Sequence, residues 1–113
     1  MNEFDFHGIE VDVSEAGFYE RLDEMRGIFE KEIPQTSFEE LKTSDAIRQY
    51  CAVFRKFFDG VLGDKSAKVI FKDVPDSIRR DNKILLEFYA FIEKQSNEII
   101  EEKNSLIEKY KPE

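Results

Sequence analysis

The stretch "YCAVFRKFFDGVLGDKSAKVIF", residues 50–71, decides how this chain folds. Its middle, "GDKS" (63–66), has some features of a phosphate-binding loop. Such a loop needs Gly, four residues and then Gly-Lys-Ser/Thr without a gap, directly after a buried strand. Here only two residues separate Gly60 from the next glycine, Asp64 would repel phosphates, and the preceding residues repeat with helical spacing. The stretch therefore predicts a corner between two helices.

This corner has two expected parts. Gly63 should follow the end of the first helix in a left-handed conformation, which a residue without a Cβ adopts easily. Asp64 should be the N-cap of a short helix from about Lys65 to Phe71. The apolar side of that helix is expected to contain Val69, Ile70 and Phe71. The helix-corner motif consists of Phe57, Phe58, Gly63, Asp64 and Phe71.

The helix before the corner has the richest apolar pattern of the chain and should form the centre of the domain. Its apolar positions are Ile47, Tyr50, Cys51, Phe54, Phe57, Phe58, Val61 and Leu62. Helical spacing favours core packing of these side chains over a cofactor pocket, and Cys51 is expected to be a buried structural thiol. "SFEE" (37–40) fits a capping box, and "TSD" (43–45) is a second start signal. Either a break near residue 43 or two helices in series is expected.

The N-terminal residues 4–13, "FDFHGIEVDV", predict a short β-hairpin. Apolar and polar residues alternate on both sides of His7-Gly8, and a two-residue turn ending in glycine is a hairpin signal. Because an isolated hairpin is marginally stable, it must pack on the helices or pair with the edge of another chain. His7, the only histidine, is expected to be a turn residue.

Residues 14–35 predict an amphipathic helix and the connector after it. Ser14 is the expected N-cap, and Glu15 is favourably placed in the first turn. Pro34 is expected to end this helix by Ile33. One helical face carries Phe18, Leu22, Met25 and Phe29.

A long terminal helix is predicted from about Asp76 to Tyr110, after a turn around Pro75. At about 1.5 Å per residue it would span about 50 Å, which exceeds the ~26 Å diameter of a domain of this size. Beyond Gln95 the helix turns polar and either frays in solvent or packs loosely against another helix. Its first half can bury Ile84, Leu85, Phe88, Phe91 and Ile92, and its second half keeps Ile99, Ile100, Leu106, Ile107 and Tyr110 as apolar residues.

We expect one domain, made of a hairpin (1–13), a helical core (14–95) and a projecting end of the last helix (96–113) that self-associates. A loose seam on the last helix would contain Leu85, Phe88, Ile92, Gln95, Ile99 and Leu106. The candidate residues for self-association are Phe4, Phe6, Ile9, Val11, Ile99, Leu106 and Tyr110.

The charge of the chain is unevenly distributed. The net charge of −8 over 113 residues argues against direct binding of nucleic acid. Residues 1–30 hold nine acids against Arg21 and Arg26, whereas the rest holds sixteen acids and fifteen bases. The acidic end serves either solubility or the electrostatic attraction of a partner or second copy. No apolar run is long enough for a signal peptide or a membrane span, so a cytoplasmic location is expected.

Residues suited to catalysis are scarce. With one histidine and one cysteine, only scattered carboxylates remain as metal ligands, and no nucleophile–base pair can be assembled. The acidic pairs Glu39-Glu40 and Glu101-Glu102 are neighbours in sequence, so their side chains point in different directions on a helix. We expect no enzymatic activity, no metal and no cofactor.

Several parts of the chain, in order, resemble the small tail assembly chaperones of long-tailed, siphovirus-like phages and prophages of Gram-positive bacteria. An alternating hairpin runs into a helix, and an aromatic helix of the form Phe-x-x-Phe-Phe-Asp-x-Val/Leu-Gly follows. The polar "DKS" (64–66), a Lys-x-Ile-Phe ending (68–71) and "LLEFYAFIEKQ" (85–95) complete the resemblance. The charged loop "DVPDSIRRD" (73–81) departs from the Gly/Asn-rich link of the family and leaves the angle of the last helix open.

The resemblance implies a non-enzymatic protein of the bacterial host cytoplasm that forms rings or spirals. It would coat the tape measure protein during tail assembly and help to recruit tail tube subunits. Two other classes stay open: an acidic DNA-mimic or inhibitor protein, which the acidic end favours, and a small helical adaptor in another phage or host complex. A gene directly upstream of a very long tape-measure-like reading frame would favour the chaperone.

Overall fold

The computed structural model describes residues 4–35, 39, 41–72 and 75–111. It has a mainly α-helical fold with a short N-terminal hairpin and a long C-terminal helix, which confirms the predicted fold class. The elements are β1 (Asp5–Phe6), β2 (Ile9–Glu10), α1 (Ala16–Glu32), the 3-10 turn η1 (Ile33–Gln35), α2 (Thr43–Leu62), α3 (Ser66–Phe71) and α4 (Ile78–Lys109).

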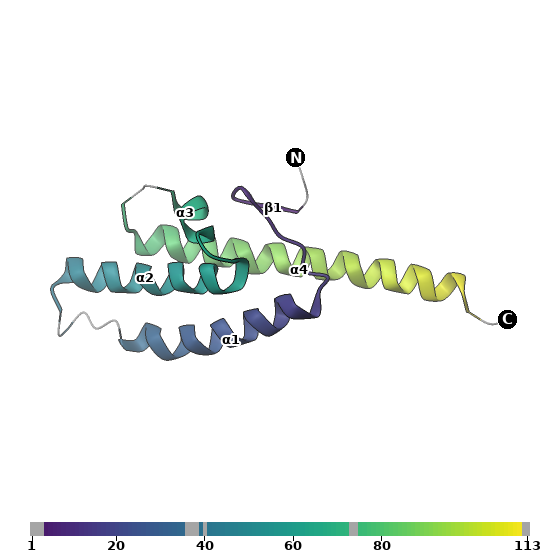
Figure 1. Cartoon of the computed structure of the whole chain (residues 1–113), viewed down its shortest axis with the longest axis horizontal. Helices are drawn as coiled ribbons and strands as arrows, with labels where there is room; N and C mark the ends of the chain where they lie inside the picture. The colour runs from purple at the N-terminus through teal and green to yellow at the C-terminus, as the bar shows by residue number, and fades with distance from the viewer. Residues whose placement is uncertain (1–3, 36–38, 40, 73–74, 112–113) are drawn as a thin grey trace.

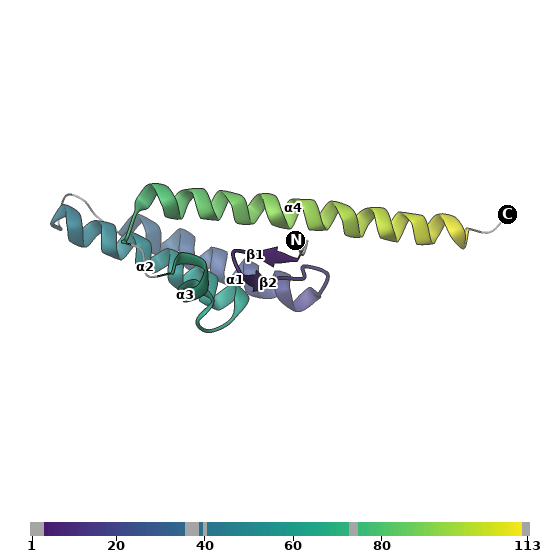
Figure 2. The ribbon, with the colours of Figure 1, turned by 90° about the horizontal axis from the view of Figure 1, so that it is seen from above.

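The helix α4 lies along one side of the molecule, and α1, α2, α3 and the hairpin lie on the other (Figure 2). Helix α1 runs antiparallel to α2 and α4, and α4 continues past the end at which α1 begins (Figure 1). The molecule is therefore elongated, measuring 68 × 29 × 22 Å. Its radius of gyration of 17.4 Å exceeds the ~13 Å of a compact domain of this length.

The hairpin is confirmed, with Phe6 opposite Ile9 and the positive φ angles of His7 (49°) and Gly8 (94°) closing a two-residue turn. The Val11 N–H donates to the Phe4 carbonyl over 2.7 Å and extends the ladder. The hairpin packs on the helices of its own chain. Phe6 and Val11 are buried there, which makes them unavailable for the contact with a second copy that the sequence suggested.

The start of α1 differs from the expectation. Helix α1 begins at Ala16, and Glu15 holds the N-cap position in an extended conformation without a side-chain cap. The prediction of Ser14 as N-cap is wrong, since its N–H donates to Asp12 Oδ1 over 2.9 Å. The physical reason is that Val13 is fully buried and tied to α4, and residues 13 and 14 form a turn, so the helix begins only after Glu15.

The end of α1 agrees with the sequence. The α-helix stops at Glu32, and Pro34 lies in the tighter turn η1 that follows. Helix α2 then begins at Thr43, so the "TSD" start signal is the one that the structure uses, with Asp45 in the first turn. The capping box at 37–40 lies largely outside the described residues.

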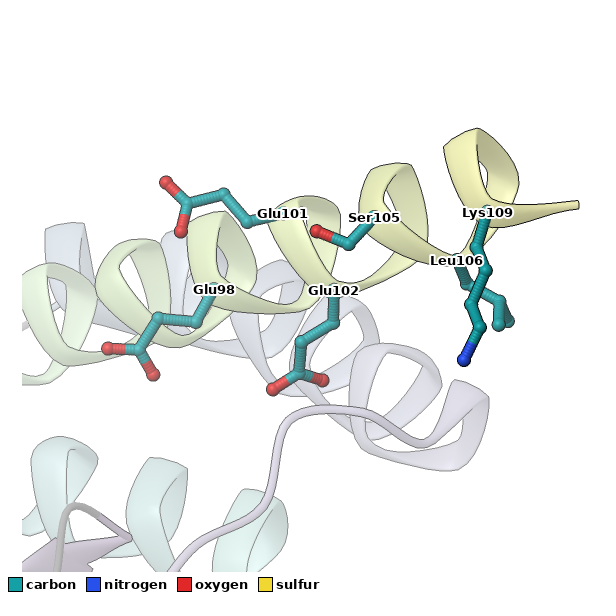
Figure 3. A pocket seen from close by; sticks show the side chains of 6 residues that line it. All are labelled: Glu98, Glu101, Glu102, Ser105, Leu106 and Lys109. Atoms are coloured by element: carbon teal, nitrogen blue, oxygen red, sulfur yellow. The ribbon is translucent and has the colours of Figure 1, made fainter. Parts of the chain in front are cut away.

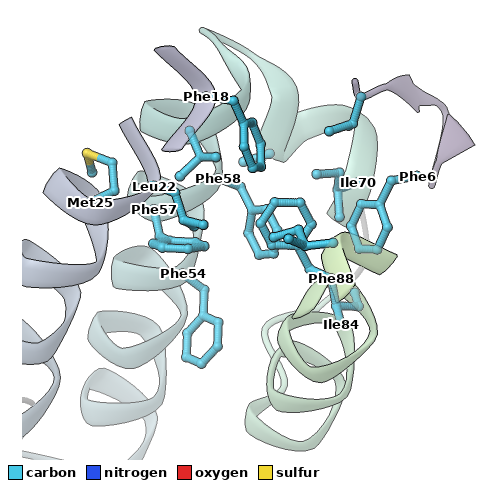
Figure 4. Close-up of a cluster of buried hydrophobic side chains, with 14 of the residues drawn as sticks. Phe6, Phe18, Leu22, Met25, Phe54, Phe57, Phe58, Ile70, Ile84 and Phe88 are labelled. Atoms are coloured by element: carbon cyan, nitrogen blue, oxygen red, sulfur yellow. The ribbon is translucent and has the colours of Figure 1, made fainter. Parts of the chain in front are cut away.

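Among the described helices, α2 has the largest number of buried residues, which agrees with the prediction that it is the centre of the domain. Together with α1, α3, α4 and the hairpin it builds an aromatic cluster, most of which is seen in Figure 4. Its fully buried rings are Phe18, Phe54, Phe57, Phe58, Phe71 and Phe88. The Phe88 ring lies 5.1 Å from the Phe6 ring and 5.2 Å from the Phe58 ring, centroid to centroid. Edge-to-face and tilted contacts of this kind add to the effect of burying the rings.

The helix corner exists, but its caps differ from the prediction. Lys65 occupies the N-cap position of α3 in a left-handed conformation (φ 70°), but its side chain does not cap the helix. The Asp64 prediction is therefore wrong. Asp59 on α2 provides the cap instead, because its Oδ1 accepts the Ala67 N–H over 2.8 Å. Val69 is 41% exposed, so the buried side of α3 consists of Ser66, Ala67, Ile70 and Phe71.

Gly63 has a positive φ, as predicted, but its ψ of 160° places it outside the left-handed helical region. That combination of angles is populated almost only by glycine and costs other residues about 1–3 kcal/mol. We expect Gly63→Ala to lower the free energy of unfolding by this amount, although a Cβ there would meet no atom within 4 Å. Urea unfolding of both proteins measures the difference. An unchanged midpoint would show that α2 ends in another conformation.

Helix α4 begins at Ile78 after an N-cap serine, because Ser77 Oγ accepts the Arg80 N–H over 3.3 Å. The predicted burial is confirmed for Ile84, Phe88 and Ile92 and is partial for Leu85 and Phe91. Residues 101–111 are all exposed, so the last contacts of α4 with the rest of the domain lie near Ile99.

Candidate interaction surface

The face of α4 that packs on the core continues beyond the core. Steps of four, four, three and four residues lead from Ile84 through Phe88, Ile92 and Gln95 to Ile99. Further steps of four, three and four lead along the same face to Lys103, Leu106 and Tyr110. We call the exposed continuation, with its flanking isoleucines, the α4 stripe: Ile99, Ile100, Lys103, Leu106, Ile107 and Tyr110.

The α4 stripe exposes much of its apolar surface. The exposed fractions are 53% for Ile100, 58% for Leu106, 54% for Ile107 and 73% for Tyr110. Single exposed apolar residues are common, but a contiguous set on one face marks an interaction site. The stripe is therefore the candidate functional surface of this chain.

A buried glutamine fixes the point at which the stripe leaves the domain. Gln95 Oε1 accepts the Val13 N–H over 3.1 Å, and Gln95 Nε2 donates to the Val11 carbonyl over 2.8 Å. The Tyr19 hydroxyl is hydrogen bonded to Ser96 Oγ at 3.0 Å. These contacts hold α4 to the N-terminal segment and to α1, so the direction of the exposed end is set by the core.

A small recess of about 140 Å³ lies beside this junction. Its lining combines apolar side chains with the carboxylate of Asp12, whose pKa is lowered by hydrogen bonds from the Ser14 side chain and backbone. The full lining is Phe4, Asp12, Ser14, Gln95, Glu98, Ile99 and Glu102. Since the recess is open to the stripe at Ile99, a partner on the stripe would reach it.

A second, wide and open hollow of about 620 Å³ runs along one flank of the stripe (Figure 3). Glu98 and Glu102 lie at its end near the domain, and Leu106 and Lys109 lie at the far end. The exposed end of α4 is therefore polarised along its length: residues 98–102 hold three acids, whereas residues 103–111 hold three lysines and one acid.

The sequence identified only part of this surface. Leu106 and Tyr110 are exposed on the stripe and Ile99 is half-buried at its base, whereas the half-buried Phe4 and Ile9 belong to the hairpin region. Phe88, Ile92 and Gln95 of the predicted seam face the chain's own core. Ile100 and Ile107 were not among the candidates for self-association, although their helical spacing places them beside Leu106.

A buried polar pair lies away from the stripe, between α2 and α4. The Asp81 side chain is fully buried and its Oδ1 accepts from Arg80 Nη2 over 3.0 Å. Cys51 is also fully buried, as predicted. Burial raises the pKa of the Cys51 thiol from 9.0 to about 12, and the nearby Asp81 carboxylate contributes to the same shift. The thiol is therefore protonated and unreactive in the folded protein.

This shift predicts a loss of stability in alkali. Between pH 9 and pH 12 the unfolded thiol releases its proton while the folded thiol keeps it, so the free energy of unfolding should fall as the pH rises. Cys51→Ala removes this contribution. We expect the stability difference between wild type and Cys51→Ala, measured by urea unfolding, to shrink above pH 9. A difference that stays constant up to pH 11 would contradict the assignment.

Within the described ranges, no group of three or more His, Cys, Asp or Glu side chains is placed to hold a metal ion. The helices described here include none with the length and apolar character needed to cross a membrane.

Comparison with known proteins places the chain in a family. The model of DUF6673, a family of unknown function, matches residues 2–113, so the chain belongs to that family. No curated protein and no solved structure matches it. Because the function of this family is unknown, the resemblance to tail assembly chaperones stays a prediction.

Proposed function

We propose that this DUF6673 protein is a non-enzymatic tail assembly chaperone of a phage or prophage. It self-associates and coats the tape measure protein while the tail is assembled in the bacterial cytoplasm. The observation that carries the proposal is the α4 stripe, an exposed apolar face on a helix whose direction the core fixes.

The stripe suits a long helical client better than a small ligand. Its residues lie on the outside of a helix, and the hollow beside it is wide and open. A client helix can meet such a face with side chains at three- and four-residue intervals. Each contact is small, so tight coating of a long client requires many copies that bind side by side, which multivalency makes possible.

Co-expression tests this function. The chain is produced together with the tape measure protein encoded nearest to its gene, with and without Leu106→Glu. We expect the wild-type chain to keep the tape measure protein soluble and to co-purify with it in many copies, and Leu106→Glu to lose both effects. A matched Asn97→Glu variant, which places the same charge at an exposed position nine residues before Leu106 and thus on the opposite side of α4, should behave as wild type. A tape measure protein that stays soluble without the chain, or a gene distant from any such reading frame, would overturn the proposal.

The acidic end favours a second candidate, an inhibitor that mimics DNA. Eight of the nine acids in residues 1–30 lie in the described part of the chain, and all eight are exposed. Asp5 and Glu10 stand opposite each other on the hairpin, a pairing of like charges that costs stability unless a partner compensates it. Tight binding to a DNA-binding protein that weakens steeply with salt would support this candidate. Its loss after Asp5→Asn and Glu10→Gln would locate the surface.

A further inference from the structure

The α4 stripe has a geometry that a second copy of the same helix can match. Ile99, Lys103, Leu106 and Tyr110 lie on one face of α4 at intervals of four, three and four residues, which is the spacing of the seam between two packed helices. Reversed, this spacing is again four, three and four. Two copies laid antiparallel therefore bring Ile99 of one opposite Tyr110 of the other, and Lys103 opposite Leu106.

The charges along the exposed end favour the antiparallel arrangement. The three acids Glu98, Glu101 and Glu102 lie near the domain, and Lys109 and Lys111 lie at the far end. An antiparallel pair places the acidic part of each copy beside the basic part of the other. A parallel pair would place acids beside acids and lysines beside lysines, which is repulsive.

The recess beside Ile99 provides a place for the largest exposed side chain of the stripe. In the antiparallel register, Tyr110 of the second copy reaches Ile99 and thus the recess of about 140 Å³. An aromatic ring in a pocket is a common anchor of an interface, and a tyrosine hydroxyl can donate to a carboxylate such as that of Asp12. Tyr110, which is 73% exposed in the single chain, would be covered in this way.

We propose that two copies of this chain pair through their α4 stripes, antiparallel, about a two-fold axis between Asn104 and Ser105. The pairing rests on the self-association that the proposed function includes and specifies its geometry. A contact over residues 99–110 is about 18 Å long, so it buries less than the ~800 Å² per partner of a standard interface. The pair is therefore weak and concentration-dependent. Because a two-fold contact closes on itself, rings or spirals would need another contact as well.

Disulfide trapping tests the orientation. Ile99→Cys and Tyr110→Cys are made separately in a Cys51→Ala background and oxidised mildly, each alone and as an equal mixture. A disulfide needs Cα atoms within about 7 Å, and in the antiparallel register the two copies of position 99 lie about 16 Å apart. We expect covalent dimers in the mixture and at least five-fold less in either variant alone. The control pair Glu101→Cys and Glu108→Cys has the same register on the opposite side of the helix and should give no enrichment.

The outcomes separate the pairing from the proposed function. If the wild-type chain self-associates but the single variants cross-link as well as the mixture does, the antiparallel pairing is wrong and self-association stands. If the chain stays monomeric at millimolar concentration, the pairing and the self-association both fail. If such a monomer still binds the tape measure protein through Leu106, the stripe serves the client alone, and the pairing is overturned while coating stands.

Discussion

Replacement of Phe88 by alanine is expected to lower the free energy of unfolding by about 3–5 kcal/mol, the usual cost of removing a buried phenylalanine ring. Phe88 is fully buried at the meeting point of α4, α2, α1 and the hairpin. Its ring contacts the rings of Phe6, Phe18, Phe57 and Phe58, which would line the resulting cavity. Since domains of this size are stable by only about 5–15 kcal/mol, the variant should lose a large part of its stability.

Leu86→Ala is the matched control, because Leu86 lies on the same helix and is 71% exposed. Its effect should stay within about 0.5 kcal/mol. Urea unfolding followed by circular dichroism measures both variants. If Phe88→Ala costs less than the Leu86 control, α4 does not pack on the aromatic cluster as described.

Gln95→Ala is expected to have the second largest effect, about 3 kcal/mol. It leaves the Val13 N–H and the Val11 carbonyl without their buried partner, and each unsatisfied group costs about 1–3 kcal/mol. It also frees the N-terminal segment from α4. Amide hydrogen exchange, measured under conditions in which the variant remains folded, should therefore be faster at the Val13 N–H than in wild type.

Gln95→Glu separates the two hydrogen bonds. A carboxylate still accepts the Val13 N–H but cannot donate to the Val11 carbonyl, so the Val13 amide should remain protected while the stability falls. Equal loss of protection in both variants would show that the Gln95 side chain does not hold this junction.

The sequence predicted the elements well where one signal dominated. The aromatic pattern of α2 identified the core, and His7-Gly8 identified the hairpin turn. The caps were less predictable, because they depend on tertiary contacts. Ser14 is a good N-cap by type, yet the bonds between Gln95 and the 11–13 segment tie the chain to α4, and Ser14 lies in a turn before the helix begins. Asp59 caps α3 from another helix, which local sequence rules cannot detect.

The candidate surface was predicted only in outline. The length of α4 indicated a projecting end, and Leu106 and Tyr110 are exposed there as expected. Alternation in the hairpin showed which residues share a face, but it could not show that Phe6 and Val11 meet the chain's own helices. The recess beside Ile99 depends on the way in which residues 12–14 cross α4, so only the three-dimensional structure reveals it.

If the α4 stripe joins copies of this chain, the molar mass in solution must depend on concentration and on the residues of the stripe. Light scattering is measured from low micromolar to millimolar concentration for the wild-type chain, for Leu106→Glu and for the matched Asn97→Glu. We expect the mass of the wild-type chain and of Asn97→Glu to rise with concentration, whereas Leu106→Glu stays a folded monomer. A wild-type chain that remains monomeric throughout, or a Leu106→Glu variant that associates as strongly as wild type, would contradict it.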